Sequence, residues 1–407
     1  MALVVQKYGG SSVGSAERIQ NVARRIEARA AAGDRVVAVV SAMGDKTDEL
    51  IELARELSKS PPAREMDVLL STGEIVSSAL LSMALHELGR DSISLTGAQA
   101  GIRTDAVYGR ARITGIETDR LERELAGGRV IIVAGFQGIS GDFDVTTIGR
   151  GGSDTTAVAL AAALHADTCE IYTDVAGVYT ADPRVCPQAR PLRDISYEEM
   201  LELATTGARV MHARAVEVGA IYGVEILVAS SFDAEAPGTI IRREATMEQS
   251  NKVRGIAHQD QIAKVTVRGL ADRPGIAAQL FEPLATAGVS VDTIVQNASV
   301  EKLTDMTFTV AQADMERAVA TVRGILPALG ASEVISDANL GAVSIVGTGM
   351  ATSPGYAALM FRTLFEHGIN IELISTSEIR ITCIVAADKV GDAVRALHAA
   401  FALDQAG

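Results

Sequence analysis

The C-terminal part of the chain contains one strand-turn-helix-strand pattern twice. The stretch "KVTVRGLADRPGIAAQLFEPLATAGVSVDTIVQNAS" aligns with "AVSIVGTGMATSPGYAALMFRTLFEHGINIELISTSE". Corresponding positions, allowing for one short insertion, are Val265 and Val343, Gly269 and Gly347, Pro274-Gly275 and Pro354-Gly355, and Gly288 and Gly368. Because a single supersecondary unit of this kind cannot bury its apolar face alone, the two copies are predicted to pack on each other.

The strands of the two copies differ in number. Each copy continues into a third strand, "DMTFTV" or "RITCIVA", and a second helix. The first copy then closes with a fourth strand, "SEVIS", whereas the second ends at "AFALDQAG" without one. We infer that "VRGIAH", Val253–His258, supplies the missing strand from ahead of the first copy. The first copy is then inserted inside the second.

The residues before the repeats alternate between strands and helices. "ALVVQKYG", "RVVAVVSAMG" and "RVIIVAGFQG" are continuous apolar runs, which are typical of parallel strands covered on both faces. Helical patterns such as "SAERIQNVARRIEARAAAG" lie between them. This alternation predicts a three-layer α/β domain. The expected division is 1–245 for this domain, 246–263 for a linker with the extra strand, 264–336 for the first copy and 337–407 for the second.

The composition excludes several classes of protein. The 407 residues carry a formal charge of −14, which argues against binding to nucleic acid or to anionic membranes. Cys169, Cys186 and Cys383 have no metal-ligand spacing, so we interpret them as reduced thiols of a cytoplasmic protein. We find no uninterrupted apolar run that is long enough to span a bilayer.

The N-terminal stretch "VVQKYGGSSVGSAERI" has the character of a phosphate-binding loop. Gly9 and Gly10 allow backbone N–H groups to approach phosphate oxygens, and the N-terminus of the following helix favours an anion. Lys7 precedes the glycines, so the spacing is not that of a Walker A loop. A lysine at the strand end is suited to neutralise a transferring phosphoryl group. A structural turn with a solvated lysine is equally compatible with this segment alone.

A second motif is "GRGGSDTTAVALAAAL". Ser153 or Asp154 is expected to cap the apolar helix that follows. A cap does not explain Arg150, which stands between glycines. The planar guanidinium of an arginine binds a carboxylate through two hydrogen bonds, so this loop is predicted to bind a carboxylate or phosphate.

Two further segments allow a structural and a functional interpretation. In "STGEIVSS", the spacing of Ser71 and Glu74 favours a helix capping box, although Glu74 could instead bind an ammonium group. In "YTDVAGVYTADPR", Asp174, Asp182 and Arg184 could contact Mg²⁺, ribose or phosphate, or could belong to a polar turn. The six histidines form no close pair and are interpreted as surface or helix-flanking residues: His86, His165, His212, His258, His367 and His398.

These motifs together resemble aspartate kinases, in particular the bacterial type regulated by lysine and threonine. "QKYGGSSV", "SAMGDKTDEL", "STGE", "TGAQAG", "GFQG", "GRGGSDTTA" and "TDVAGVYTADPR" occur in the order found in that family, and the paired repeats resemble its ACT domains. The resemblance implies the amino acid kinase fold, a three-layer αβα sandwich with a mostly parallel sheet, followed by two ferredoxin-like ACT domains. It also implies phosphoryl transfer from ATP, with Mg²⁺, to the side chain of L-aspartate.

The resemblance assigns roles to individual residues. Lys7 and Asp154 would be catalytic. L-aspartate would contact Thr47, Glu74, Arg150, Gly151, Gly152 and Ser153. ATP would lie along Lys7, Tyr8, Gly9, Gly10, Thr173, Asp174, Tyr179, Asp182 and Arg184. No residue is assigned as a metal ligand. Because the substrate carboxylate is already ionised at neutral pH, the reaction needs no general base.

The repeats are expected to regulate the enzyme. Helix-opening N–H groups at a Pro-Gly turn can bind the carboxylate of an amino acid, and Asp272 can accept from its ammonium. In the second copy Met350 replaces that aspartate, so the two sites should differ. The resemblance suggests threonine and lysine as effectors. The candidate effector residues are Asp272, Pro274, Gly275, Ile276, Ala277, Gln296, Asn297, Asn370 and Ile371.

Other interpretations remain open from the sequence. The N-terminal domain could phosphorylate glutamate or a nucleoside monophosphate, although two ACT-like copies fit aspartate kinase best. The chain could also be an amino-acid sensor with an inactive kinase scaffold, and the repeats could serve only to assemble a homo-oligomer. Met247 could start a separate small subunit, in which case the full chain would form a hetero-oligomer with it.

Overall fold

The computed structural model describes every residue except 209, 244–251, 299–302, 351–352 and 406–407. Met247, the candidate internal start, therefore lies outside the described residues. The chain divides into two compact units. The first comprises Met1–Tyr179, Pro191–Thr205 and Arg209–Glu248, and the second comprises Thr180–Arg190, Thr206–Ala208 and Gln249–Gly407.

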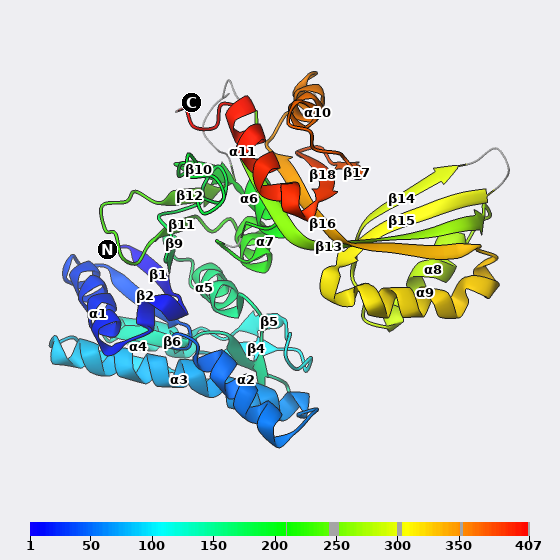
Figure 1. Cartoon of the computed structure of the whole chain (residues 1–407). Coiled ribbons are helices and arrows are strands. Elements are labelled where there is room, and N and C mark those ends of the chain that lie inside the picture. The colour runs from blue at the N-terminus through cyan, green and yellow to red at the C-terminus, as the bar shows by residue number, and fades with distance from the viewer. Residues whose placement is uncertain (209, 244–251, 299–302, 351–352, 406–407) are drawn as a thin grey trace. The chain divides into compact units, whose positions relative to one another are not determined.

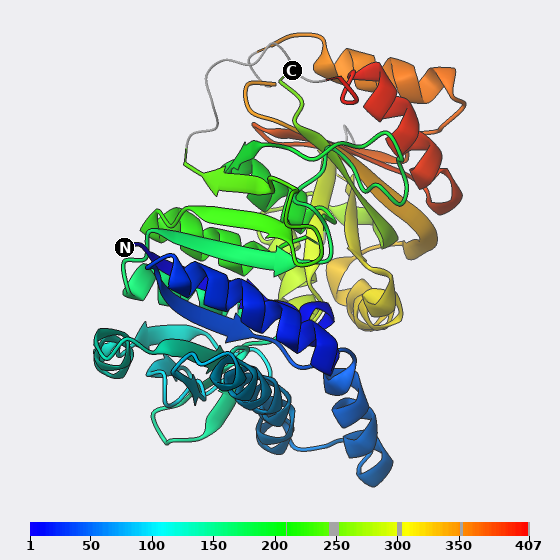
Figure 2. The same cartoon turned by 90° about the vertical axis from the view of Figure 1, so that its left-hand side faces the viewer.

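The first unit is built on an eight-stranded sheet in the order β10-β12-β11-β9-β1-β2-β6-β3 (Figures 1 and 2). The strands from β11 to β3 are parallel, and β12 runs antiparallel to β11. The bounds are β1 Leu3–Tyr8, β2 Arg35–Val40, β3 Ser92–Leu95, β6 Val130–Ala134, β9 Thr168–Thr173, β10 Asp194–Ser196, β11 Ile226–Ser230 and β12 Thr239–Arg242. The central strands are continuous apolar runs because both faces of the sheet are covered.

The helices of the first unit cover the two faces. On one face, α1 (Ala16–Ala31) and α3 (Ala63–Glu87) pack on the sheet through Ile26, Leu81 and Leu85. On the other, α5 (Gly152–Ala163) contacts β1, β2 and β9. The remaining helices are η1 Gly10–Val13, α2 Lys46–Leu57, α4 Asp119–Ala126, α6 Tyr197–Thr205 and α7 Ala213–Tyr222. This is the predicted three-layer sandwich.

A small sheet, which we did not predict, has the order β5-β4-β7-β8. Its strands are β4 Ile102–Thr104, β5 Ile113–Ile116, β7 Gln137–Ile139 and β8 Val145–Thr147.

The long helix α3 has, among the described residues, the length and hydropathy of a membrane-spanning segment. Its buried residues include Asp67 and Glu74, and Asp67 accepts hydrogen bonds from Gly109 and Thr147. These polar contacts are those of a helix packed inside the protein.

The second unit contains one antiparallel six-stranded sheet in the order β14-β15-β13-β16-β18-β17. Its strands are β13 Gly255–Ala271, β14 Val291–Ala298, β15 Leu303–Ala311, β16 Glu333–Val346, β17 Leu373–Thr376 and β18 Arg380–Ala386. Its helices are α8 Ile276–Thr286, η2 Gln312–Asp314, α9 Met315–Leu329, α10 Tyr356–Glu366, η3 Ala387–Lys389 and α11 Val390–Ala400.

Two long strands are shared by the repeats. The first part of β13 pairs with the second part of β16, with Ile256 opposite Ile345, and the second part pairs with the first part of β16, with Val265 opposite Ser336. The segment expected to complete the second copy therefore does so from Gly255 onward, and the first copy lies inside the second. Each copy has its own apolar core, around Phe308 in the first and Val343 in the second.

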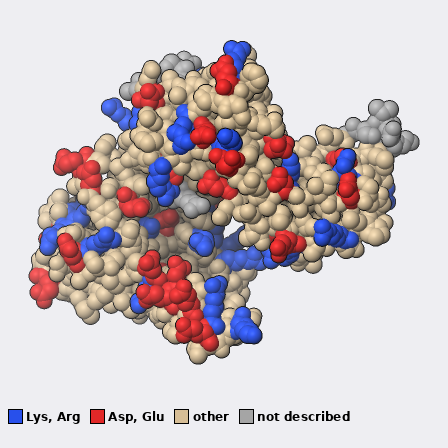
Figure 3. Space-filling model, in the orientation of Figure 1, with Lys and Arg blue, Asp and Glu red and all other residues tan. Residues whose placement is uncertain are grey.

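The expected boundary at residue 245 differs from this division, most clearly at two segments. Thr180–Arg190 and Thr206–Ala208 belong to the second unit although they lie within the first 245 residues. Ala181 and Cys186 of the longer segment are buried in the core of the second copy, which is a tertiary contact that local sequence patterns do not reveal. On the face shown in Figure 3, acidic and basic side chains are interspersed.

Candidate active site

The carboxyl ends of the parallel strands form the candidate site. Tyr8, the last residue of β1, is opposite Val40 in β2 and Tyr172 in β9, so these three strands end at the same level. Ligands of open α/β sheets bind beyond such strand ends. The loops that follow β1 and β2 and the N-terminus of α5 carry the motifs singled out from the sequence.

The glycines after β1 bring two loops together. Gly9 donates its N–H to the carbonyl of Tyr172 at 3.3 Å, and Gly10 accepts from the N–H of Gly44 at 3.1 Å. A Cβ atom on Gly10 would lie 2.8 Å from the carbonyl oxygen of Ala42, which is too close for any other residue. The requirement for glycine here is therefore steric.

The N-terminus of α5 differs from the cap that was predicted from the sequence. Neither Ser153 nor Asp154 is the N-cap; that position is Gly151, in the left-handed conformation with φ of 68°, and no side chain caps the helix. A Cβ atom on Gly151 would overlap the ring of His212 at 2.2–2.6 Å. Asp154 instead lies in the first helical turn, where its charge complements the helix dipole.

Lys7 and Asp154 form an ion pair at this edge. Lys7 Nζ lies 2.7 Å from Asp154 Oδ1, and the two side chains are only 12% and 11% exposed. The contact brings the charges together but is not aligned as a hydrogen bond, since Asp154 Oδ1 has no hydrogen-bond partner among the described residues. The lysine ammonium also lies close to Gly9, 3.4 Å from the position that a Cβ would take. A cation is thus held directly over the glycine loop.

Glu74 is not part of a capping box. Ser71 and Glu74 both lie in the interior of α3, where the Ser71 hydroxyl donates to the carbonyl of Val68, so the structural interpretation favoured by spacing is wrong. Gly73 allows α3 to approach Ala42, and Glu74 Oε1 accepts from the Ala42 N–H at 3.1 Å. Oε2 is buried and has no partner among the described residues. Burial raises the pKa of Glu74 to about 7.

The other candidate substrate residues are more exposed. Thr47 is the second residue of α2 and is half-buried. Arg150 is exposed and, within the part of the chain that the structure describes, makes no hydrogen bond or ion pair. The buried Gly152 and Ser153 follow it at the start of α5.

The candidate ATP residues fall in both units. Thr173 ends β9, and its hydroxyl donates to the exposed Asp174 at 3.0 Å. Tyr179 forms a bridge with Pro191. The side chain of Tyr8 is fully buried and stacks on Tyr172, so only its backbone is available to a ligand.

Asp182 and Arg184 belong to the second unit. Arg184 NH2 lies 2.7 Å from Asp182 Oδ2, and hydrogen bonds from Arg184 hold the pKa of Asp182 below its usual value. The arginine side chain is 79% exposed. The pair therefore offers a guanidinium to solvent while its carboxylate remains ionised.

A cavity of about 1120 Å³ elsewhere in the first unit is lined by residues of β5, α5 and α7. Its arginine, Arg214, donates to the carbonyls of Ile148 and Ala111, which fixes the loop ahead of α5. None of the candidate catalytic residues lines it, so we assign it no role in the reaction.

The first candidate effector group lies at one end of the second unit's sheet. Thr304 at the start of β15 is opposite Leu270 in β13 and Ala298 in β14, so the Asp272 loop and Asn297 flank the same strand end. Gly275 is the N-cap of α8 with φ of 90°, and Ile276 opens the helix. Asp272, Pro274, Ala277 and Gln296 are exposed.

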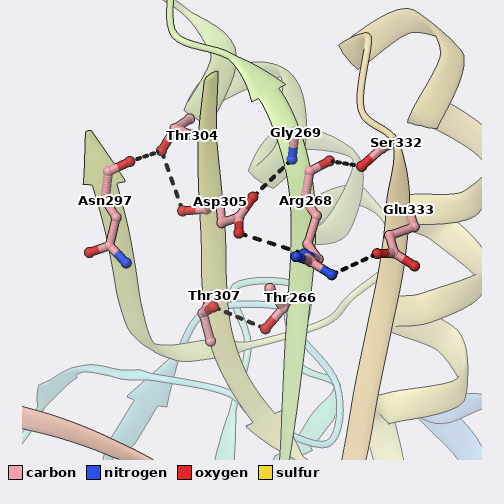
Figure 4. A network of polar contacts seen from close by, with 9 residues as sticks. All are labelled: Thr266, Arg268, Gly269, Asn297, Thr304, Asp305, Thr307, Ser332 and Glu333. Carbon is pink, nitrogen blue, oxygen red and sulfur yellow. Dashed lines mark hydrogen bonds and ion pairs between the residues drawn. The ribbon is translucent and has the colours of Figure 1, made fainter. Parts of the chain in front are cut away.

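A polar network centred on Arg268 and Asp305 lines a cavity of about 470 Å³, which Asn297 also lines (Figure 4). Arg268 donates to Glu333 at 3.0 Å and lies 3.7 Å from Asp305, which also accepts from the Gly269 N–H. The cavity thus has two carboxylates and one guanidinium at its wall.

The second group of candidate effector residues does not lie beside the first group in the sheet of one chain. Asn370 and Ile371 precede β17, which is at the edge of the sheet opposite β14. Asn370 donates to Glu372 at 2.9 Å. Met350, which replaces the aspartate of the first copy, is buried in the apolar core of the second. The expected difference between the copies is therefore a difference between an exposed carboxylate and a core side chain.

Comparison with known protein families agrees with the fold. Residues 2–230 match the amino acid kinase family, and 265–324 and 343–401 match an ACT domain family. The class of protein is thus an ATP-dependent kinase of small molecules that carries two ACT regulatory modules.

The relatives define the family within this class. The chain is 51% identical to aspartokinase 2 of Bacillus subtilis, covering 100% of this chain and 99% of that protein, and 50% identical to the aspartokinase of Bacillus sp. strain MGA3, covering 99% and 98%. The structure of E. coli aspartokinase III with aspartate and ADP matches with a TM-score of 0.82 and 25% identity over 98% of this chain and 99% of that one. The chain belongs to the aspartokinase family.

As an aspartate kinase, the chain transfers the γ-phosphoryl group of ATP to the side-chain carboxylate of L-aspartate, giving 4-phospho-L-aspartate and ADP. The reaction uses Mg²⁺, which neutralises phosphate charge. Among the described residues no cluster of three or more metal-ligating side chains occurs. In kinases Mg²⁺ is held mainly by the phosphates and one or two carboxylates, so an ion that enters with ATP does not require such a cluster.

Proposed function

We propose that Lys7 is the catalytic cation of this aspartate kinase. The observation that carries the proposal is its ion pair with Asp154 at 2.7 Å, beside the glycine loop and the uncapped N-terminus of α5. Negative charge spreads over the phosphoryl oxygens as the group leaves ADP. A fixed ammonium, backbone N–H groups and a helix dipole all stabilise charge at that point.

The substrate needs an environment of mixed charge. Arg150 has no competing partner among the described residues and can bind the α-carboxylate of aspartate through two hydrogen bonds. The unpartnered Oε2 of Glu74 is suited to accept from the α-ammonium, and we propose that the carboxylate of Asp154 also faces that group. Thr47, Gly151, Gly152 and Ser153 complete the proposed aspartate site. These groups leave the side-chain carboxylate free to react.

The chemistry balances without a proton transfer. One oxygen of the ionised side-chain carboxylate attacks the γ-phosphorus, a new P–O bond forms, and the bond between that phosphorus and the bridging oxygen of ADP breaks. The ordinary pKa of an aspartate side chain is about 4, so the carboxylate is an anion before it binds. The protein's contribution is to position two anions and to screen their repulsion. We propose that the nucleotide lies along Tyr8, Gly9, Gly10, Thr173, Asp174, Tyr179, Asp182 and Arg184.

The direct test is a coupled assay of ADP release with each proteinogenic amino acid in turn. Aspartate should support turnover, and Arg150→Ala should raise its KM while affecting ATP less. Equal turnover with glutamate would contradict the assignment of the substrate site.

We also propose that the repeats bind threonine and lysine and that binding inhibits the kinase. Support comes from the loop of Asp272 and the N-terminus of α8, which provide an ammonium acceptor and N–H donors at the same strand end as Gln296 and Asn297. The solved structure of E. coli aspartokinase III with lysine and aspartate, a T-state, matches this chain with a TM-score of 0.74 and 26% identity. An effector shifts a population only through its differential affinity for two states.

The assembly is a further proposal. Asn370 and Ile371 lie at the opposite edge of the sheet from the Asp272 group, so a shared effector site requires a second copy of the ACT repeats. That copy belongs to a homo-oligomer or to a small subunit translated from Met247. Expression of the complete gene, with the Met247 codon changed to Leu as control, should show whether the short chain disappears. We propose a cytoplasmic location, which is supported by three free, buried cysteines.

A further inference from the structure

The segment Thr180–Arg190, which we call the 180–190 loop, belongs to the second unit although the segments on both sides of it in the sequence belong to the first. The chain leaves the first unit after Tyr179 and returns to it at Pro191. The two sides of the loop are joined by backbone hydrogen bonds, from Leu192 N–H to the Val178 carbonyl at 2.8 Å and from Thr180 N–H to the Arg190 carbonyl at 2.9 Å. The loop is therefore a narrow antiparallel ribbon whose closed end belongs to the regulatory unit.

The closed end is part of the core of the second repeat. Ala181 is 3% exposed and Cys186 is 1% exposed, and both are members of the apolar cluster that includes Leu397 and Phe401 of the C-terminal helix region. Val185 and Ala189 pack against the same cluster. Residues that are buried in a regulatory core cannot move independently of it.

Polar contacts fix the loop from several directions. The Ile256 N–H of β13 donates to the Thr180 carbonyl at 2.8 Å. Arg190 Nε donates to the Leu403 carbonyl at 3.0 Å, and Arg395 of α11 donates to the Val185 carbonyl at 3.1 Å. The loop is thus bound to the first strand and to the last helix of the second repeat.

A buried side-chain pair determines the position of the loop most specifically. Thr180 and His398 are 0% and 2% exposed, and Thr180 Oγ1 lies 2.9 Å from His398 Nε2. The same hydroxyl accepts from the Arg190 N–H at 3.1 Å. Burial lowers the pKa of His398, so its ring is neutral at neutral pH. We interpreted His398 from the sequence as a surface or helix-flanking residue, and this was wrong.

Hydrophobic packing alone would allow the ribbon to slide along its own axis. The buried contact between the hydroxyl and the imidazole penalises such a shift, because the imidazole would lose its partner in an apolar core and the hydroxyl would keep only the bond from Arg190. Asp182 and Arg184 follow Thr180 by two and four residues and are already joined by their own ion pair. Their positions therefore depend on where Thr180 is held.

We propose that His398 is a positioning residue for the nucleotide: through Thr180 it fixes the 180–190 loop and thereby the Asp182–Arg184 pair. The proposal rests on the proposed role of that pair in binding ATP. It places a determinant of ATP affinity in the last helix of the chain, within the core of the second regulatory repeat. A rearrangement of that repeat then displaces Asp182 and Arg184, because both residues belong to the loop that is held in its core.

The test compares full-length variants by the KM for ATP, the KM for aspartate, and calorimetry of ADP binding. Asp182→Asn tests the proposed nucleotide contact itself. Thr180→Val removes the hydroxyl, His398→Gln disrupts the imidazole partner, and Thr180→Ser restores the hydroxyl. As a matched control, Thr382→Val removes a buried hydroxyl of the same repeat, which bonds to Ser344 at 2.7 Å and not to the loop.

We expect His398→Gln to raise the ATP KM and the ADP dissociation constant about fivefold, the typical cost of one lost hydrogen bond, and Thr180→Val, which also loses the bond from Arg190, to raise them at least as much. The aspartate KM should stay within twofold, and Thr180→Ser should retain the normal ATP KM. Thr382→Val should lower the melting temperature without changing either KM. If Asp182→Asn raises the ATP KM and neither Thr180→Val nor His398→Gln does, His398 is not a positioning residue. If Asp182→Asn also has no effect, the assignment of the pair to ATP is wrong.

Discussion

Glu74 should make aspartate binding depend on pH in a way that can be calculated from the structure. Its Oε2 is buried without a partner among the described residues, and burial raises its pKa to about 7. Only the ionised form attracts the α-ammonium of aspartate. The ionised fraction is about 0.9 at pH 8 and about 0.1 at pH 6. The aspartate KM should therefore be about tenfold higher at pH 6 than at pH 8.

The assay is a titration of the aspartate KM at saturating ATP from pH 6 to pH 8.5, repeated with Glu74→Gln. The variant should have a higher KM that no longer changes with pH. Glu65→Gln, which alters a largely exposed glutamate of the same helix, is the matched control and should behave as the parent enzyme. Calorimetry of the parent at pH 6 should show release of up to about one proton per aspartate bound. A KM that is constant from pH 6 to pH 8 would refute the reasoning.

The same pKa has a consequence for stability. The pKa of folded Glu74 is raised above its unfolded value, so its stabilising contribution is complete below pH 4.5 and is lost as the pH rises through about 7. Above pH 8 the ligand-free enzyme therefore loses about 3 kcal/mol at this site, as an upper figure. Thermal melts without aspartate should show Glu74→Gln to be more stable than the parent at pH 8, and a less stable variant would contradict this account.

Three further predictions concern catalysis, specificity and regulation. Lys7→Ala should lower kcat about 100-fold or more, because a preorganised charge at the reacting group contributes about 3 kcal/mol; near-normal turnover of a folded variant would remove the role assigned to Lys7. Arg150→Ala should raise the aspartate KM strongly and the ATP KM little, and the opposite pattern in initial-rate kinetics would make Arg150 a phosphate ligand. Asp272→Ala should relieve inhibition by threonine with lysine while leaving uninhibited turnover unchanged, and persistent inhibition in a dose-response assay would place the effector elsewhere.

Much of the fold could be predicted because its signals are local and periodic. The apolar runs of the parallel strands and the alignment of the two repeats were sufficient to predict the layered domain and the insertion of one repeat inside the other. The pairing of Ile256 with Ile345 follows from a missing strand in the second copy, which is visible in the sequence. The short strands of the small sheet have no comparable signal, since three or four residues are too few to show a periodicity.

The errors at the candidate site have physical causes. Ser71 and Glu74 match a capping box in spacing, but apolar residues on both sides extend α3 through them, and both side chains lie on the buried face of that helix. The cap expected at Ser153 or Asp154 was wrong because the left-handed conformation of Gly151 begins α5 without a side chain. The burial of His398 against Thr180 depends on a contact across 218 residues, which no local pattern contains.

The central claim is that Lys7, held at 2.7 Å from Asp154 over the glycine loop, stabilises the phosphoryl group during its transfer to aspartate. A single-turnover measurement of the parent and Lys7→Ala, with enzyme in excess over radiolabelled ATP and saturating aspartate, isolates that step from ADP release. The account predicts that formation of 4-phospho-L-aspartate slows about 100-fold or more in the variant. A transfer rate equal to that of the parent, in a variant with unchanged melting temperature, would contradict it.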